Sequence, residues 1–167
     1  MYDELTKIDI AKMQEEIDHR VRVLRPSLLE EVKTARAFGD LSENFEYKAA
    51  KREKNSNDSR VRYLERMIKT AKVISGESIP GKIGLFDRVE VYFEEDDEIQ
   101  NIQLVTTLRQ DALKGLISKE SPIGKALMGH KVGDRVCVEV SPNCSYFIVI
   151  RSVEKGQDDA SIPISTY

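Results

Sequence analysis

Two carboxylates stand close together in the segment 39–47, between two long stretches with helical periodicity. Asp40 and Glu43 are three positions apart and follow Gly39, which predicts the end of a helix and a turn. Carboxylate oxygens are ligands that Mg²⁺ prefers. A loosely held second Mg²⁺ in two-metal phosphodiester hydrolysis needs extra ligands of this kind. The pair could therefore complete a metal site that another macromolecule supplies.

The same two residues also fit a purely structural role. An Asp followed three residues later by a Glu resembles a capping box, in which both side chains bind backbone N–H groups at a helix start. Carboxylates are favourable near a helix N-terminus for electrostatic reasons as well. Residue types alone favour this cap for the second helix, although a cap and a metal site are compatible.

The first helical stretch begins at Thr6, which with Asp9 forms a capping-box pattern, and it ends before Gly39. Pro26 falls inside the pattern and should bend the helix or break its hydrogen bonding locally. We expect one kinked helix whose apolar seam continues on both sides. The seam residues, at steps of three and four, are Ile10, Met13, Ile17, Val21, Leu24, Leu28, Val32 and Ala35.

The second stretch has a matching seam, so the two helices should pair as an antiparallel coiled-coil hairpin. Each arm of roughly thirty residues would be about 45 Å long at 1.5 Å per residue. Lys54 and Asn57 occupy seam positions, which predicts weaker packing toward the turn or a device that fixes the register. The seam residues are Tyr47, Ala50, Lys54, Asn57, Val61, Leu64, Ile68 and Ala71.

Basic residues dominate the second helix, with nine Lys or Arg against three Asp or Glu in residues 48–72. A solvated face usually mixes both signs, whereas one face here is almost entirely positive. Such a face suits the backbone of a polyanion, although a merely solvated helix surface remains an alternative. We call this face the basic stripe: Lys48, Lys51, Arg52, Arg62, Arg66 and Lys69.

The remainder of the chain predicts a small α+β domain built on an antiparallel sheet. The helices end at the Gly- and Pro-containing segment 75–81. We therefore expect a hairpin over 1–79, a sheet domain over 80–155 and a loose tail over 156–167. Strands are predicted at 89–93, 99–106, 116–119, 135–140 and 146–153, with a short helix at 123–128 and a turn at 141–143.

Several classes of protein are disfavoured by composition. Cys137, Cys144 and His130 include no CxxC pair and predict free thiols in a reducing compartment rather than a zinc site. No apolar run is long enough to span a membrane, and the first residues lack the character of a signal peptide. We expect a cytoplasmic protein without membrane contact.

Residues 35–50 resemble the signature of the bacterial Gre transcript-cleavage factors (GreA/GreB), whose tip has the pattern GDL-x-EN-x-EY. Residues 115–118, 121–129 and 132–134 are similar to that family's C-terminal signature. The order and spacing agree from about Leu5 to about Val153. One departure is the segment 105–111, which lacks the VG-x-x-E-A-D stretch found in many members.

This resemblance implies a coiled-coil hairpin followed by a domain with an FKBP-like fold. It further implies binding to RNA polymerase, entry of the hairpin into the secondary channel, and stimulation of the polymerase's own cleavage of backtracked nascent RNA. Asp40 and Glu43 match the tip carboxylates that family members place beside the polymerase's Mg²⁺. The segment Glu120-Ser121-Pro122 matches the docking contact with the polymerase.

By this interpretation the protein is no enzyme by itself, binds no Mg²⁺ when free, and is expected to be a monomer. Two other functions stay open. A Gre-like inhibitor or pausing factor could occupy the same channel without catalysis, and a coiled-coil chaperone or peptidyl-prolyl isomerase would also fit the architecture. Fold alone does not carry isomerase activity.

Overall fold

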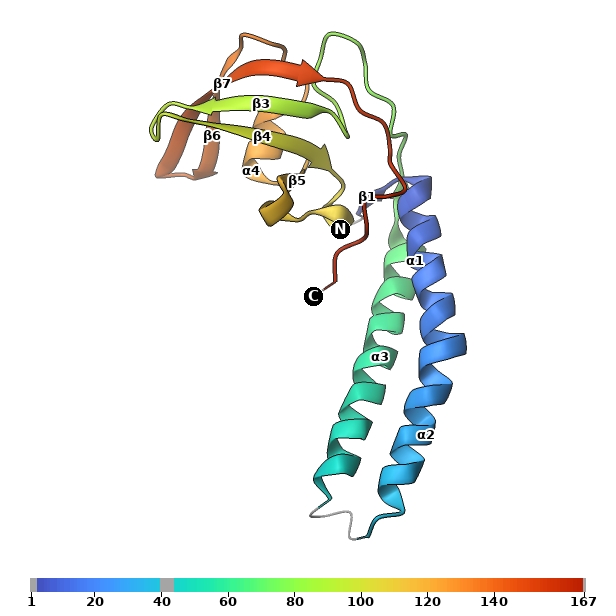
Figure 1. Ribbon diagram of the computed structural model, residues 1–167. Helices are drawn as coiled ribbons and strands as arrows, with labels where there is room; N and C mark the ends of the chain where they lie inside the picture. The colour runs from blue at the N-terminus through green and yellow to red at the C-terminus, as the bar shows by residue number, and fades with distance from the viewer. Residues whose placement is uncertain (1–2, 40–43, 167) are drawn as a thin grey trace. The chain divides into compact units, whose positions relative to one another are not determined.

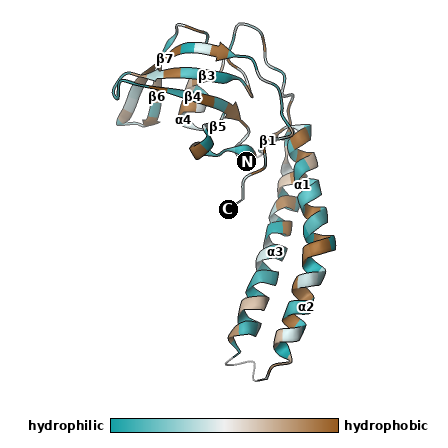
Figure 2. Ribbon diagram, viewed as in Figure 1, coloured by the Kyte–Doolittle hydropathy of each residue, from teal (hydrophilic) through white to brown (hydrophobic). Residues whose placement is uncertain are grey.

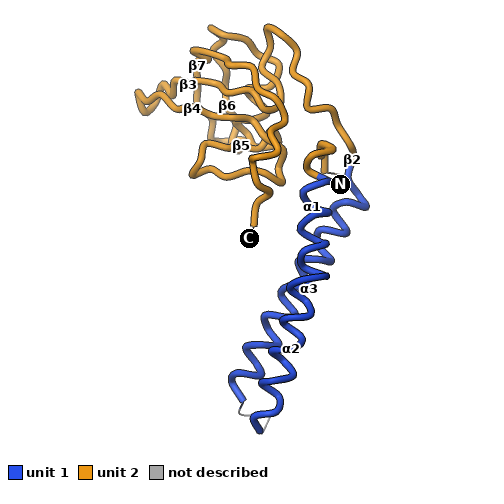
Figure 3. Tube along the Cα trace, turned by 45° about the vertical axis from the view of Figure 1, so that its right-hand side comes forward, with its two compact units in different colours: residues 1–2, 10–71 blue, residues 3–9, 72–167 orange. Residues whose placement is uncertain are grey.

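The computed structural model describes residues 3–39 and 44–166. It contains two compact units (Figure 3), one comprising Ile10–Ala71 and the other comprising Asp3–Asp9 together with Lys72–Tyr167. The predicted boundary at residue 79 therefore differs from the structural one, because a segment at the start of the chain belongs to the C-terminal unit. None of the described helices is long and apolar enough to cross a bilayer.

The helical unit is a hairpin. Its first arm contains α1 (Lys7–His19), a π-helical turn η1 (Arg20–Leu24) and α2 (Arg25–Arg36), and its second arm is α3 (Phe45–Thr70) (Figure 1). All sixteen predicted seam residues are buried or half-buried. Figure 2 shows hydrophilic and hydrophobic bands alternating along both arms, as expected where helices bury one stripe. The predicted antiparallel hairpin is confirmed.

Pro26 explains the π turn that separates α1 from α2. A proline has no N–H to donate, and its ring clashes with the carbonyl four residues earlier, here that of Arg22. The Arg25 N–H bonds to the Arg20 carbonyl, which is a five-residue spacing in place of the usual four. The predicted local break in hydrogen bonding is confirmed, and it takes the form of a π turn.

A polar cluster joins the two arms beside this turn. Asn57 is only 4% exposed, and its amide donates to the Arg20 carbonyl at 3.1 Å while accepting from the Arg20 guanidinium at 3.0 Å. Glu16 pairs with Arg20 at 2.8 Å and with Arg60 at 2.9 Å. Burial raises the pKa of Glu16, but the two guanidinium groups outweigh it and hold the pKa below its ordinary value. Asn57 is therefore satisfied and well placed to fix the register of the arms.

The C-terminal unit contains a five-stranded sheet in the order β5-β4-β3-β7-β6 (Figure 1). Its elements are β3 (Arg88–Phe93), β4 (Glu98–Val105), β5 (Leu116–Ser118), β6 (Arg135–Ser141), β7 (Cys144–Glu154), the 3₁₀ turns η2 (Thr107–Arg109) and η3 (Ala112–Lys114), and α4 (Pro122–Leu127). The predicted α+β class is confirmed. The sheet is mixed, however, because β5 runs parallel to β4 while the other neighbours are antiparallel.

One face of this sheet is covered by α4 and buries alternate residues, as the two-residue period of strands requires. Leu127 of α4 packs with Val89 and Val91 of β3 and with residues of three further strands. Those further residues are Ile102, Leu104, Val136, Val138, Ile148 and Ile150. Gly124 is required in α4, because a Cβ there would lie 2.1 Å from the Ser118 carbonyl oxygen.

The start of the chain and its tail both join the C-terminal unit. β1 (Glu4–Leu5) pairs in parallel with β2 (Lys72–Val73). The Gly156 N–H donates to the Asp87 carboxylate at 3.0 Å, and the Ser165 N–H donates to the Leu108 carbonyl at 2.7 Å. The structure thus differs from the expectation of a loose tail over 156–167, because this segment has specific partners.

A buried arginine connects these segments. The Arg109 guanidinium, 0% exposed, pairs with the Asp9 carboxylate, also 0% exposed, and with the Asp158 carboxylate at 2.7 Å. It also donates to the Asp159 carbonyl at 3.1 Å and lies over the Phe86 ring at 5.2 Å. Asp9 in turn takes part in the predicted capping box, in which it accepts from the Thr6 N–H at 3.0 Å.

Candidate functional site

The two predicted tip carboxylates, Asp40 and Glu43, lie outside the described residues. The chain on either side of them is described. α2 ends at Arg36, and Gly39 has a φ of +129°, a conformation that favours glycine. α3 then begins at Phe45. Residues 40–43 therefore stand in the chain between the end of one helix and the start of the next.

Asn44 frames this turn from the α3 side. Its side-chain oxygen accepts from the Tyr47 N–H at 3.0 Å, and this makes it the N-cap of α3. Its amide nitrogen donates to the Ala35 carbonyl at 2.7 Å, which ties the start of α3 to the end of α2. The interpretation of Asp40 as the cap of the second helix is thus corrected. The helix begins at Phe45, and the Asn44 side chain accepts the hydrogen bond of a backbone N–H in its first turn.

Replacing Asn44 by Ala is expected to destabilise the hairpin by about 1 kcal/mol, the usual cost of a lost N-cap. Hydrogen exchange of amides in residues 45–48 should accelerate. Asn44→Asp keeps the accepting oxygen but loses the donor to Ala35, so it separates the two bonds. Asn55→Ala, at an exposed position of the same helix, is the control; equal effects of both alanine variants would contradict the cap.

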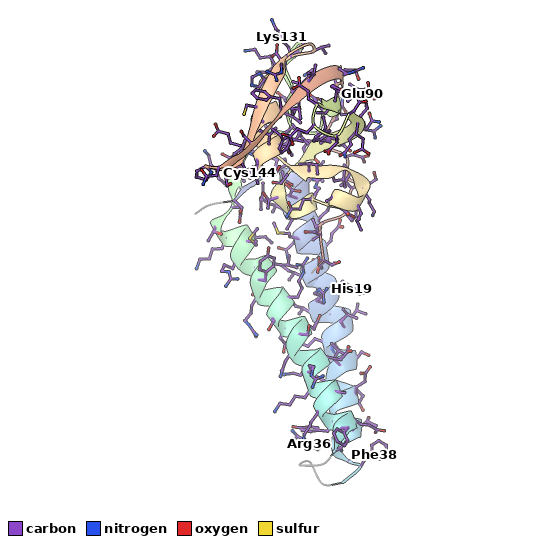
Figure 4. All side chains as sticks on the ribbon, turned by 90° about the vertical axis from the view of Figure 1, so that its left-hand side faces the viewer. His19, Arg36, Phe38, Glu90, Lys131 and Cys144 are labelled. Carbon is purple, nitrogen blue, oxygen red and sulfur yellow. The ribbon has the colours of Figure 1, made fainter. Side chains whose placement is uncertain are left out.

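Aromatic and basic side chains meet just beyond the cap. The Arg36 guanidinium donates to the Tyr47 hydroxyl at 3.3 Å and lies 5.5 Å from the centre of its ring. This hydrogen bond lowers the pKa of the Tyr47 hydroxyl. Lys51 lies over the same ring at 5.9 Å. Figure 4 shows Arg36 and Phe38 at the end of the hairpin.

The basic stripe lies along the outside of α3. All six of its members are exposed, and none forms an ion pair with another described residue. Other basic residues of the hairpin are engaged: Arg25 and Lys54 both pair with Asp58, at 3.0 and 3.4 Å. The stripe is therefore an exposed, positively charged face whose charges are not neutralised by carboxylates of the described residues.

The predicted docking segment Glu120-Ser121-Pro122 lies in the C-terminal unit. Ser121 is the N-cap of α4: it accepts from the Gly124 N–H at 3.0 Å and donates to the Ser118 carbonyl at 2.6 Å. Pro122 and Glu120 are exposed. Lys119 pairs with Glu4 and with Glu120; burial lowers its pKa, but these carboxylates outweigh burial and raise it above the ordinary value. The segment is a well-supported turn that presents exposed residues.

Among the residues that the structure describes, Cys137, Cys144 and His130 belong to no group of potential metal ligands. Cys137 and Cys144 are free thiols on the surface, and His130 bonds to the Asp134 carboxylate at 3.2 Å.

Sequence patterns missed Asn44 and Arg109. Asn44 could have been identified from the sequence, because Asn is a favourable N-cap residue and stands directly before Phe45. Arg109 lies in a 3₁₀ turn, and no local sequence pattern indicates that its side chain is buried.

Residues 4–73 match the family described as "Transcription elongation factor, N-terminal". Residues 78–155 match the family described as "Transcription elongation factor, GreA/GreB, C-term". The two matches together leave only the ends and a short junction uncovered.

Curated relatives agree with this assignment. The chain is 44% identical to "Transcription elongation factor GreA" of Thermoanaerobacter pseudethanolicus over 81% of its own length and 87% of the relative's. It is 36% identical to the protein of the same name from Oenococcus oeni over 92% and 95%. Among solved structures, it resembles the GreA factor homolog 1 (Gfh1) of Thermus thermophilus with 25% identity, a TM-score of 0.42 and coverage of 93% and 100%. The chain belongs to the GreA/GreB family of transcription elongation factors.

Proposed function

We propose that this protein binds RNA polymerase, inserts its hairpin into the secondary channel, and stimulates the polymerase's own cleavage of backtracked nascent RNA. Family membership supports the partner. The hairpin supports the mode of action, because α3, with 26 residues, is about 39 Å long at 1.5 Å per residue. The single observation that carries the proposal is the match of both parts of the chain to the GreA/GreB family, and the identity of Asn44 as the N-cap of α3 is compatible with a metal-binding role for Asp40 and Glu43.

Asp40 and Glu43 would act as Mg²⁺ ligands under this proposal. Their donor set fits the ion, since Mg²⁺ prefers carboxylate oxygens and commonly binds proteins through one or two of them. Two carboxylates fill only part of its octahedral shell, so the ion would be shared with the polymerase. When bound, the ion would activate water and stabilise charge on the reacting phosphate. The free protein is accordingly expected to hydrolyse no RNA.

The C-terminal unit would supply docking. Glu120 and Pro122 are exposed on a turn that the Ser121 hydrogen bonds hold in place. A rigid contact of this kind limits the entropy lost on binding. Docking by one unit also raises the effective concentration of the hairpin at the channel.

The direct test is cleavage of end-labelled RNA in a defined backtracked complex, with and without the full chain. Faster shortening of the RNA supports a cleavage factor. Slower shortening, with polymerase still bound, would instead identify an inhibitor of the same family. Absence of polymerase binding would exclude both.

Reversing three charges of the basic stripe, with Arg52→Glu, Arg62→Glu and Arg66→Glu, is expected to weaken stimulation of cleavage about tenfold or more at low salt, and this defect should shrink at higher salt, where screening weakens the parent's contacts as well. The side chains are exposed on α3, so circular dichroism should show an intact hairpin. Reversals at exposed Lys33, Lys82 and Lys131 give the same change in net charge away from the stripe and should have little effect. Unchanged cleavage by the stripe variant at every salt concentration would show that the stripe is a solvated helix surface and does not bind RNA.

A further inference from the structure

Two phenylalanines at the end of the hairpin are exposed to solvent. Phe38 is 71% exposed and Phe45 is 81% exposed, and they flank the turn from opposite sides. Single exposed apolar residues are common on protein surfaces. The surroundings of each ring decide whether it suits a ligand, and these differ between the two.

Phe45 belongs to the positive side of the hairpin. It is the first residue of α3, and Lys48 lies over its ring at 5.8 Å. Residues 45, 48 and 52 are three and four positions apart, so they share one face of the helix. A shallow depression continues along this face, lined by Lys48, Lys51, Arg52, Asn55, Ser56 and Ser59. Phe45 therefore forms the end of the basic stripe nearest the turn.

Phe38 belongs to a negative side. It lines a groove whose charged members are all acidic, namely Glu30, Glu31 and Glu46. Phosphate groups would be repelled there. The chain thus offers two similar rings in opposite electrostatic settings.

A row of cations that form no ion pair with the described residues, and that leads to an exposed aromatic ring, has the features of a single-stranded nucleic-acid site. In such sites the cations follow the backbone phosphates, and aromatic rings stack on bases. Asn55 and Ser59, which lie within the row, add hydrogen-bonding groups suited to phosphate or sugar. A protein partner would have to present a matching row of acidic side chains, whereas every nucleotide of an RNA supplies a phosphate.

We propose that Phe45 is a stacking platform for one base of single-stranded RNA, whose phosphates lie along Lys48, Lys51 and Arg52. The inference deepens the proposed function by naming the residue that engages the RNA near the turn. It assigns no such role to Phe38. Because the contact belongs to the free chain, it can be tested without polymerase and without cleavage.

The test measures binding of a fluorescent single-stranded RNA of about ten nucleotides to the full chain at low salt, by fluorescence anisotropy. Phe45→Ala and Phe45→Leu are both expected to weaken binding about five- to 150-fold, the range reported for loss of one base stack. Leu retains apolar bulk but has no aromatic face. Phe45→Trp should bind at least as tightly as the parent, and Phe38→Ala should change binding less than about twofold.

Three results would overturn the inference. Parental RNA binding by Phe45→Leu would show that only apolar bulk matters. Equal losses in Phe38→Ala and Phe45→Ala would show a general effect of the tip. Unchanged RNA binding by Phe45→Ala, with weaker binding to polymerase that carries no RNA, would identify Phe45 as a protein contact. A chain that binds RNA as expected but fails to stimulate cleavage would refute the proposed function and leave this inference intact.

Discussion

The double variant Asp40→Asn with Glu43→Gln is expected to lose stimulation of RNA cleavage by about a hundredfold or more. Neutral amides are poor replacements for carboxylates in holding Mg²⁺, and a catalytic metal ion supplies several kcal/mol of transition-state stabilisation, with each 1.36 kcal/mol worth about tenfold in rate. The measurement is the rate of RNA shortening in a backtracked complex at saturating factor. Partial recovery is expected at high Mg²⁺ or Mn²⁺.

This variant should remain folded and should still bind polymerase. The cap of α3 is Asn44, whose hydrogen bonds to Tyr47 and Ala35 are untouched by the change. Asn and Gln also tolerate positions near a helix start, so hairpin stability should change by no more than about 1 kcal/mol. The variant should compete with the parent protein for polymerase.

Asn44→Ala provides the opposite control, since it removes the cap and keeps both carboxylates. It should lower hairpin stability more than the double variant does and retain more cleavage stimulation. If the double variant stimulates cleavage as well as the parent at ordinary Mg²⁺, the carboxylates are not metal ligands and the proposed mechanism fails.

The helical arms could be predicted in detail because their signal is local and repeated. Steps of three and four residues place every seam residue on one face, and each of these residues is buried or half-buried, although Arg60, outside the pattern, is buried as well. Asn57 is instructive, because periodicity placed it in the seam without indicating its partners. Those partners, the carbonyl and guanidinium of Arg20, belong to the first residue of the π turn, which periodicity does not indicate.

Strands were predicted nearly as well, whereas their pairing was not. Alternating apolar and polar residues predict a strand such as 89–93. This pattern does not indicate whether the neighbouring strand runs parallel or antiparallel. β5 lies parallel to β4 because η2 and η3 and the connection at residues 106–115 return the chain to the same end of the sheet. Connections of this kind depend on tertiary contacts that no local pattern records.

Prediction of the candidate site shows the same division. The spacing of Asp40 and Glu43 suggested a cap or a metal site, and the described structure weakens the cap by assigning it to Asn44. The basic stripe was predicted from helical projection, and its exposure agrees. The contrast between Phe45 and Phe38 could not be predicted, since it depends on which charges α2 and α3 bring beside each ring.

The contacts of Arg109 show why the domain boundary predicted at residue 79 differs from the structural one: residues 3–9 belong to the C-terminal unit. A fragment cut at residues 79 and 80 would separate Arg109 from Asp9 and Thr6, with which it shares hydrogen bonds in the C-terminal unit. Fragments that retain residues 3–9 are required if the docking unit is to be studied alone.

Replacing Arg109 by Met is expected to destabilise the C-terminal unit by about 3–5 kcal/mol, because removal of one partner leaves a buried charge uncompensated. Asp9 is 0% exposed and Asp158 only 14% exposed, so water cannot replace the guanidinium without opening the unit. Hydrogen exchange of core amides in β3 and β4 should accelerate, and amides of the tail near Ser165 should lose protection.

Arg135→Met is the matched control for this change. Arg135 makes a two-pronged ion pair with Glu94, at 2.7 and 2.8 Å, but its side chain is 55% exposed. Exposed ion pairs contribute little to stability because water solvates both partners, so exchange of the same core amides should remain close to that of the parent. Equal acceleration in the two variants would show that burial of Arg109 adds nothing beyond an ordinary surface pair. A double variant that also replaces Asp9 by Leu should recover part of the loss, because it removes the uncompensated charge rather than leaving it without a partner.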